Sequence, residues 1–166
     1  MTCVAQAALA AVVLLSLASA PARADDSLTC NSVQGQAAID ACTRLIESGN
    51  PGAEDRPALF FNDRGYVYDE LGQHARAIKD YDEAIRLEPD NETAFGLRGN
   101  AYRKMGQYAR AVQDFDEAIR LQTPDYEPDY ASVYYERSLA EGAMGKTTAA
   151  DADLAKARSI DPDVGQ

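Results

Sequence analysis

The chain has 166 residues, a length typical of one domain. Hydrophobic residues make up 46% of it and charged residues 26%, which is enough apolar material for a packed core. A formal net charge of −11 at pH 7 disfavours nucleic acids and anionic membrane surfaces as partners, because their phosphates would be repelled.

The first segment, residues 1–24, has the features of a cleaved signal peptide. Residues 4–20 are nearly all apolar or small, and Ala22 and Ala24 provide the small side chains of an A-x-A cleavage site. The run is short for a membrane span, although no lysine or arginine precedes it. We therefore expect cleavage after Ala24 and a periplasmic or secreted protein. The alternative is an uncleaved membrane anchor.

Two cysteines remain after such a cleavage, because Cys3 would leave with the signal. An even pair in an oxidising compartment favours a disulfide between Cys30 and Cys42, worth roughly 2–4 kcal/mol. A two-ligand metal site or a redox pair is the alternative. The spacing is far from C-x-x-C, and the single histidine, His74, is distant in sequence.

Residues 25–57 form an N-terminal segment in which the pattern predicts one helix, over residues 36–47. The stretch 38–46 mimics the second helices of the repeats described next. We interpret it as a lone helix that caps the exposed apolar face of the first repeat. The glycines and proline at 49–52 end it.

Two consecutive segments, 58–91 and 92–125, are copies of one another. Residues 82–87 recur unchanged as 116–121, and about 16 of the 34 aligned positions are identical. Each copy predicts two helices, which in the first copy cover residues 59–71 and 75–87. Gly72 is placed at the end of one helix and Pro89 just beyond the other, positions that both residues favour.

A third, degenerate copy covers residues 131–164. It aligns with the second copy at an offset of about 39, so about five residues are inserted between them. The insertion falls at 123–129, where prolines and aspartates predict a turn.

The repeated pattern resembles the tetratricopeptide repeat (TPR) family over residues 58–163. That family has a small residue at position 8 and an aromatic at position 24, supplied here by Gly65 with Tyr81 and by Gly99 with Phe115. The third copy departs at position 11, where Glu141 replaces the aromatic. The resemblance implies an all-α fold of helix-turn-helix repeats stacked in a right-handed solenoid, with the first helices lining its concave face.

The resemblance also implies which residues contact a ligand. The expected groove is acidic in the first copy, basic in the second and open or apolar in the third. The residues of the chaperone-binding carboxylate clamp are missing, because Tyr66, Leu97 and Glu136 stand at three of its positions. The candidate contact residues on the concave face are Asn62, Tyr66, Asp69, Leu97, Asn100, Arg103, Lys104, Tyr135 and Leu139.

Every copy has an arginine at position 7 and an aspartate at position 23. Antiparallel pairing of the two helices should bring these side chains together, and a guanidinium can hold a carboxylate with two hydrogen bonds. The alternatives are unrelated surface charges or a basic ladder facing the groove. The predicted structural salt bridges are Arg64–Asp80, Arg98–Asp114 and Arg137–Asp153.

No catalytic motif is recognisable, and His74 is expected in an exposed turn. We therefore predict a non-catalytic adaptor in the cell envelope, without a metal or cofactor, that binds another protein or peptide. Nucleic acid is not expected as a partner, nor is a membrane once the signal is cleaved. The alternative is a self-assembling structural module, which makes a homo-oligomer possible.

Overall fold

The computed structural model describes residues 25–32, 35–49, 57–122 and 130–166. The predicted signal peptide, its cleavage site after Ala24 and the predicted turn at 123–129 lie outside these residues. The described part contains eight helices and no strand, so the predicted all-α class is confirmed. The helices are α1 (Asp26–Ser32), α2 (Gln36–Ser48), α3 (Pro57–Glu70), α4 (His74–Leu87), α5 (Glu92–Lys104), α6 (Tyr108–Leu121), α7 (Tyr130–Ala143) and α8 (Thr147–Ile160).

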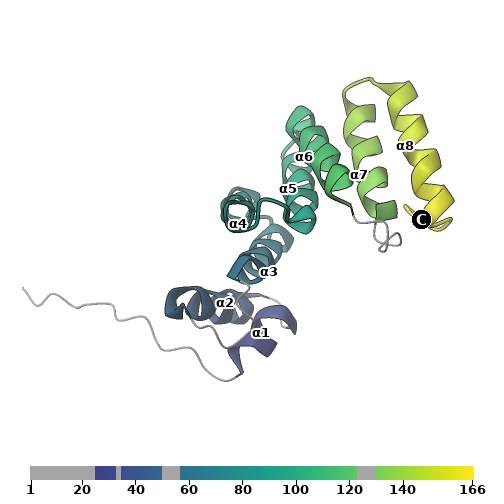
Figure 1. Cartoon of the computed structure of the whole chain (residues 1–166). Coiled ribbons are helices and arrows are strands. Elements are labelled where there is room, and N and C mark those ends of the chain that lie inside the picture. The colour runs from purple at the N-terminus through teal and green to yellow at the C-terminus, as the bar shows by residue number, and fades with distance from the viewer. Residues whose placement is uncertain (1–24, 33–34, 50–56, 123–129) are drawn as a thin grey trace, which may run out of the picture.

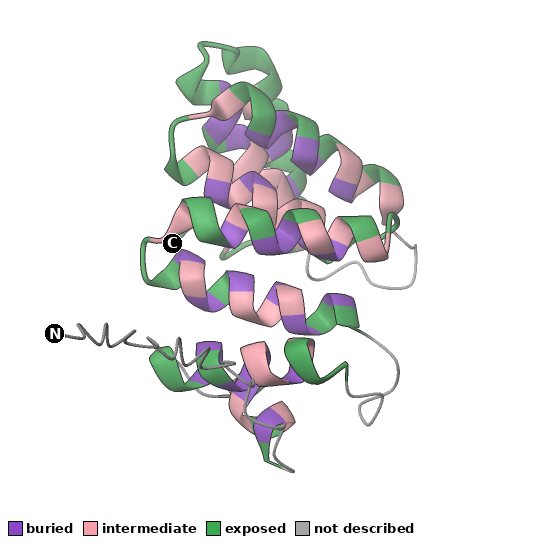
Figure 2. Ribbon diagram, turned by 90° about the vertical axis from the view of Figure 1, so that its left-hand side faces the viewer, coloured by how far each residue is buried: buried purple, intermediate pink, exposed green. Residues whose placement is uncertain are grey.

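The helices stack in chain order into the expected solenoid (Figure 1). The pairs α3/α4, α5/α6 and α7/α8 are hairpins, and each hairpin packs on the next through its second helix. The first helices also contact one another, α3 with α5 and α5 with α7. Buried residues lie on the sides of the helices that face their neighbours (Figure 2).

The three hairpins turn in the same way. Gly72, Gly106 and Gly145 have φ values of 72°, 73° and 76°, a left-handed conformation that glycine adopts without steric cost. In each turn the residue after the glycine donates its backbone N–H to a carbonyl five residues earlier, as from Lys146 to Glu141 at 3.0 Å. The degenerate third copy therefore keeps the turn of the other two.

Two glycines set the distance between the helices of the first two hairpins. A Cβ on Gly65 would lie 2.6 Å from the Tyr81 ring, and one on Gly99 would lie 2.8 Å from the Phe115 ring. Both rings are fully buried. The third copy has Ser138 here, and its Oγ donates to the Tyr135 carbonyl at 2.6 Å.

The N-terminal cap differs from the expectation of a lone helix. The short helix α1 packs on α2, and their Cys30 and Cys42 Sγ atoms are 2.13 Å apart. Arg44 donates from Nε to the buried Asp26 carboxylate at 3.0 Å. The sequence does not predict α1, because seven residues are too few to show a helical period. The disulfide and the Arg44–Asp26 pair hold α1 against α2. The cap then covers α3 through Phe60.

Arginines connect both the helices within a hairpin and successive hairpins. We call Arg64, Arg98 and Arg137 the arginine ladder. Each donates from Nε and Nη2 to both carboxylate oxygens of one aspartate, at 2.6–2.8 Å. The acceptors are Asp80 for Arg64, Asp114 for Arg98 and Asp153 for Arg137, so each predicted pair is present.

The remaining guanidinium nitrogen, Nη1, reaches back to the preceding helix of the stack. Arg98 donates to Asp82 of α4 at 2.6 Å, and Arg137 donates to Asp116 of α6 at 2.6 Å. Arg64 donates to Thr43 of the cap at 3.0 Å. Because all three guanidinium nitrogens of each ladder arginine have partners within the protein, the ladder belongs to the scaffold.

Adding a methyl group at Gly99 should destabilise the fold. Gly99→Ala forces the Phe115 ring out of a close-packed site and should lower the free energy of unfolding by about 1–3 kcal/mol. Gly96→Ala is the control on the same helix, because its Cβ would meet only Val133, at 3.9 Å. Urea denaturation measures both variants, and equal losses would contradict the packing argument.

The two aspartates that bind the ladder from α6 should differ in energetic importance. Asp114 is buried, so Asp114→Ala leaves the Arg98 guanidinium without its bidentate partner and should cost about 3 kcal/mol. The Asp116 side chain is 57% exposed, so Asp116→Ala should cost less than about 1 kcal/mol. Chemical denaturation of both variants tests this ranking, and a larger loss for Asp116→Ala would refute it.

Candidate functional site

The concave face formed by the first helices carries two neighbouring pockets. The larger, which we call the acidic pocket, has a volume of about 490 Å³ and lies between α3 and the start of α5. Four carboxylates border it. Its lining residues are Leu59, Asn62, Asp63, Tyr66, Glu88, Asp90, Asn91, Glu92, Thr93 and Leu97.

A chain of side-chain hydrogen bonds shapes one wall of the acidic pocket. Asn91 caps α5, since its Oδ1 accepts the Ala94 backbone N–H at 2.9 Å. Its Nδ2 donates to Glu88 at 3.0 Å. Asn62 must therefore turn its own Nδ2 toward Asn91 Oδ1, at 3.3 Å. This leaves the Asn62 Oδ1, on a side chain that is 6% exposed, without a donor among the described residues.

Asp63 is the titratable group whose environment differs most from water at this pocket. Burial raises the pKa of its carboxyl to about 6. Its Oδ2 lies 3.8 Å from the Cys30 sulfur, and within the described part of the chain it has no ion pair. A half-buried carboxylate without a counter-ion destabilises the fold when ionised, which is a frequent property of binding sites.

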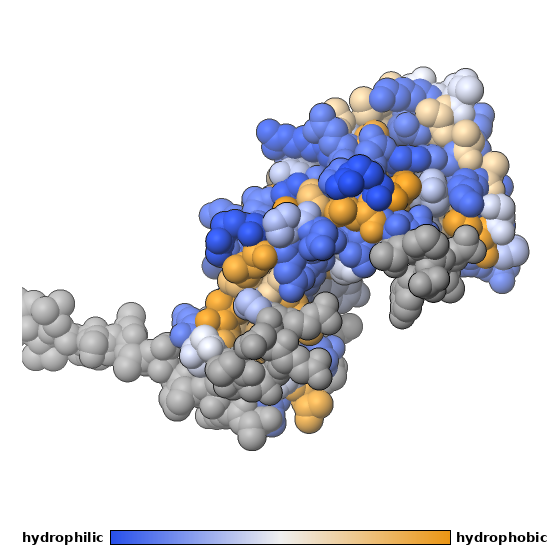
Figure 3. Space-filling model, in the orientation of Figure 1, coloured by the Kyte–Doolittle hydropathy of each residue, from blue (hydrophilic) through white to orange (hydrophobic). Residues whose placement is uncertain are grey.

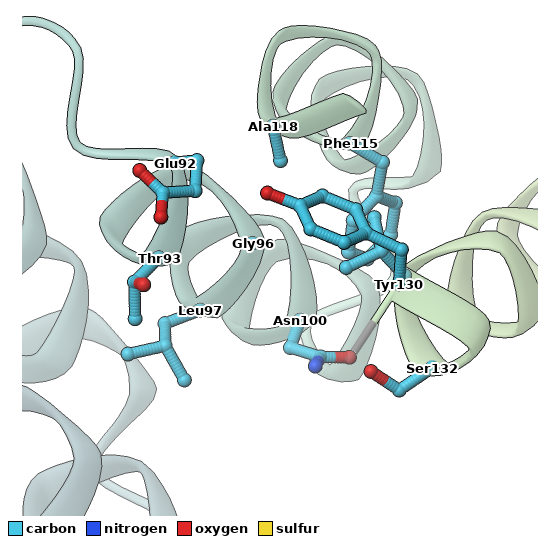
Figure 4. A pocket seen from close by; sticks show the side chains of 10 residues that line it. Glu92, Thr93, Gly96, Leu97, Asn100, Phe115, Ala118, Tyr130 and Ser132 are labelled. Carbon is cyan, nitrogen blue, oxygen red and sulfur yellow. The ribbon is translucent and has the colours of Figure 1, made fainter. Parts of the chain in front are cut away.

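The second pocket, which we call the apolar pocket, has a volume of about 260 Å³ and lies between α5, α6 and α7. The rings of Phe115 and Tyr130 bound it on one side, and Leu97 and Thr93 lie on the other (Figure 4). Asn100 also lines this pocket, and its buried Oδ1 has no hydrogen-bond partner among the described residues.

The two pockets form one groove, because Glu92, Thr93 and Leu97 line both. The groove thus runs from the first repeat to the third. The surface seen in Figure 3 is mainly hydrophilic, with apolar side chains in small separate patches.

Four of the nine predicted contact residues lie in this groove: Asn62 and Tyr66 in the acidic pocket, Asn100 in the apolar pocket, and Leu97 in both. They differ in accessibility. Tyr66 is 46% exposed, whereas Asn62 is buried.

The prediction that Arg103 and Lys104 form a basic section of the groove is wrong. Arg103 forms an ion pair with Glu136 at 2.5 Å. Lys104 donates to the buried carboxylate of Asp69 at 2.7 Å, so Asp69 is not free for a ligand either. These pairs join successive hairpins, which is why the pattern within one repeat does not reveal them.

The other expectations gave mixed results. The Tyr135 ring lies against Gly165, where a Cβ would be only 2.5 Å from it, so the C-terminal turn covers this side chain. Leu139 is 40% exposed on α7. His74 begins α4 rather than standing free in a turn, and its Nδ1 lies 2.6 Å from the Asp69 carboxylate.

The sequence pattern does not predict several of the residues that line the two pockets. Glu88, Asp90 and Asn91 come from the turn between α4 and α5, and Glu92 begins α5. The acidic residues at 88–92 are the only sequence feature that could have predicted them, and such a segment is indistinguishable from an ordinary turn in the sequence. Phe115 and Tyr130 also line the apolar pocket, although the repeat pattern assigns Phe115 to the core and gives Tyr130 no role.

Among the described residues, no three or more histidine, cysteine or acidic side chains come together in a way that could hold a metal ion. The helices described here are also too short or too polar to cross a membrane.

Comparisons with known proteins agree with the repeat architecture. A family model described as "TPR repeat" matches residues 65–106, and one described as "Tetratricopeptide repeat" matches residues 93–122. The comparison with curated proteins found no match.

Several solved structures are similar to this chain. The second TPR domain of human RPAP3, in complex with the HSP70 peptide SGPTIEEVD, is 27% identical, with a TM-score of 0.58 over 65% of this chain and 86% of that one. The first TPR of Spaghetti, bound to the HSP90 peptide SRMEEVD, is 25% identical, with a TM-score of 0.60 over 65% and 82%. MamA shares the fold, at 24% identity and a TM-score of 0.63 over 76% and 68%.

Removing the charge of Asp63 should stabilise the protein in a pH-dependent way. The pKa of Asp63 is raised in the folded state, so its carboxyl does not lower the free energy of unfolding below pH 3.8, where it is protonated in the folded and the unfolded chain. This free energy falls as the pH rises through about 6 and the buried carboxyl ionises. Asp63→Asn should therefore have a higher Tm than the original chain at pH 8 and the same Tm near pH 3.5.

Thermal unfolding followed by circular dichroism across this pH range provides the measurement. Asp151→Asn removes the same charge at an exposed position of α8 and should change the Tm little at any pH. A lower Tm for Asp63→Asn at pH 8 would show that the ionised carboxylate is stabilised after all.

Proposed function

We infer that this chain, which belongs to the tetratricopeptide repeat family, is a non-catalytic adaptor that binds a segment of another protein in its concave groove. The observation that carries this inference is the continuity of the acidic and apolar pockets through Glu92, Thr93 and Leu97. A continuous groove along successive first helices fits an extended chain better than a compact small molecule.

The polar groups of the groove support a peptide as the occupant. The Oδ1 atoms of Asn62 and Asn100 are buried acceptors without donors among the described residues, one in each pocket. Unpaired buried acceptors cost free energy until a ligand supplies a donor. Peptide backbone N–H groups and donor side chains are such groups. Tyr66 adds an exposed aromatic surface, a common anchor in protein interfaces.

The similar domains of RPAP3 and Spaghetti bind peptides that end in E-E-V-D. The present groove is suited to different sequences, since the acidic pocket repels carboxylates and the positions of the chaperone clamp hold Tyr66, Leu97 and Glu136. We therefore infer from these similar domains only that the chain binds a peptide, and we infer the chemistry of that peptide from the groove itself.

The titratable groups described here support an adaptor role without catalysis. Asp63 has a raised pKa, but the residues that line its pocket include no histidine, cysteine, serine or lysine to act with it. The single histidine, His74, is paired with Asp69. TPR domains are in general non-catalytic adaptors.

We place this adaptor in the periplasm or outside the cell, in agreement with the apolar run before residue 24 and the paired Cys30 and Cys42. A protein partner rather than nucleic acid or membrane suits the net charge of −11. Self-assembly of the chain is the alternative function, and light scattering of the purified protein tests it. A stable oligomer without added peptide would favour self-assembly.

Selection of peptides from a random display library on the purified protein tests the proposed function. We expect selected peptides to bind, and Tyr66→Ala/Asn100→Ala to weaken that binding about tenfold or more, because it removes one anchor from each pocket. Leu71→Ala/Met144→Ala, at exposed apolar residues outside the groove, is the control and should leave the Kd unchanged. Equal effects of the two double variants would contradict a groove-bound peptide.

A further inference from the structure

We propose that the acidic pocket binds the side chain of a lysine or arginine in the bound segment. This proposal rests on the proposed function, and it adds the chemical class of the residue that is recognised. The pocket is built to accept hydrogen bonds and positive charge, and the residues that the structure describes bring no cation to it.

Positive and negative charges are unevenly paired across the described residues. Throughout the described residues, most acidic side chains near the helix interfaces have a cationic partner, as Asp69 has in Lys104 and Glu136 has in Arg103. The acidic pocket, like the buried Glu141 of α7, is an exception. Within the described part of the chain its four carboxylates form no ion pair, and only that of Glu88 accepts a side-chain N–H, from Asn91. They belong to Asp63, Glu88, Asp90 and Glu92.

Asn62 provides support for a hydrogen-bond donor that is independent of charge. Its orientation is fixed, because Asn91 Oδ1 already accepts the capping N–H of Ala94 and can only accept from Asn62 as well. Asn62 lines the pocket, and the Oδ1 of this buried side chain therefore has no donor in the described structure. A ligand group that satisfies Asn62 must donate a hydrogen bond.

A lysine ammonium offers three donors and an arginine guanidinium five, each with a positive charge. Both match a pocket of carboxylates around an amide oxygen. Burial, which raises the pKa of Asp63 to about 6, is the kind of unfavourable environment that a bound cation relieves. An acidic or neutral apolar side chain would leave the Asn62 oxygen unpaired.

The pocket wall distinguishes a cationic side chain from a bare metal ion. Leu59 is 40% exposed and Tyr66 46% exposed, so apolar surface stands beside the carboxylates. The methylene stem of lysine or arginine can pack on it, and the charged end can approach the tyrosine ring. The carboxylates do not converge as metal ligands do, because the described residues hold no such group.

A set of peptides with one changed residue tests the proposal. The probe is a fluorescently labelled peptide from the display selection and its variants, with lysine, arginine, norleucine or glutamate at each position in turn. Fluorescence anisotropy gives the Kd. At one position, replacing the cationic residue by norleucine should weaken binding about tenfold, and glutamate should weaken it further. Raising the salt concentration should reduce the lysine–norleucine difference.

Matched variants of the protein locate the effect. Asp63→Asn/Asp90→Asn removes two charges from the pocket and should abolish most of the preference for lysine over norleucine. Asn62→Leu removes the acceptor and should reduce the same preference. Asp151→Asn/Asp163→Asn makes the same charge change at exposed C-terminal residues and should keep the preference intact. Circular dichroism checks that each variant is folded.

The outcomes separate the two proposals. If peptides bind in the groove but neutral or acidic residues are preferred at every position, the lysine pocket is refuted and the adaptor function stands. If the preference for lysine persists in Asp63→Asn/Asp90→Asn, the cation binds elsewhere and the proposal is equally refuted. If no peptide binds, the proposed function itself fails.

Discussion

The arginine ladder is the interaction on which the rest of the structure depends. Each guanidinium uses two nitrogens for the aspartate of its own hairpin and a third for the preceding helix of the stack, as Arg98 does with Asp114 and Asp82. A ring of the same helix lies beneath it, such as Phe95 beneath Arg98 at 5.4 Å. Because the planar fork fixes both distance and angle, the ladder sets the geometry within a hairpin and between hairpins.

The ladder also determines which charges remain for a ligand. The chain has 27 acidic and 16 basic residues, and the ladder and the pairs between hairpins engage cations such as Arg64, Arg103 and Lys104. The acidic residues in excess must lie elsewhere, and several meet where the turn at 88–92 faces α3. The negative potential of the acidic pocket is thus a consequence of how the scaffold uses its positive charge.

The sequence predicts what repeats itself. Two similar copies revealed the hairpins, the role of Gly99 and the ladder, because each of these features lies within one repeat or recurs in all three. The helix α1 escaped prediction because seven residues show no period. The pairing of Arg103 with Glu136 escaped because it joins different repeats, so that its formation depends on their stacking. The acidic pocket escaped for the same reason, since α3 and the 88–92 turn meet only in the fold.

The third repeat shows which interactions act as units. In the first two, Arg76 lies over the Tyr68 ring at 5.2 Å and Arg110 over the Tyr102 ring at 5.5 Å. The third copy has lost both members together, with Glu141 and Ala149 in their place, while it has kept both members of the Arg137–Asp153 pair.

The groove residues are neither kept nor lost in pairs, because the three copies have different residues at these positions. The position of Asn62 is occupied by Gly96 and Tyr135 in the other copies, and that of Asp63 by Leu97 and Glu136. A residue that stabilises the repeat is useful in every copy, whereas a residue that contacts one part of a ligand is useful only once. The residues around the acidic pocket that differ between the copies are therefore those that the scaffold does not require, which fits the role in partner recognition that we propose for them.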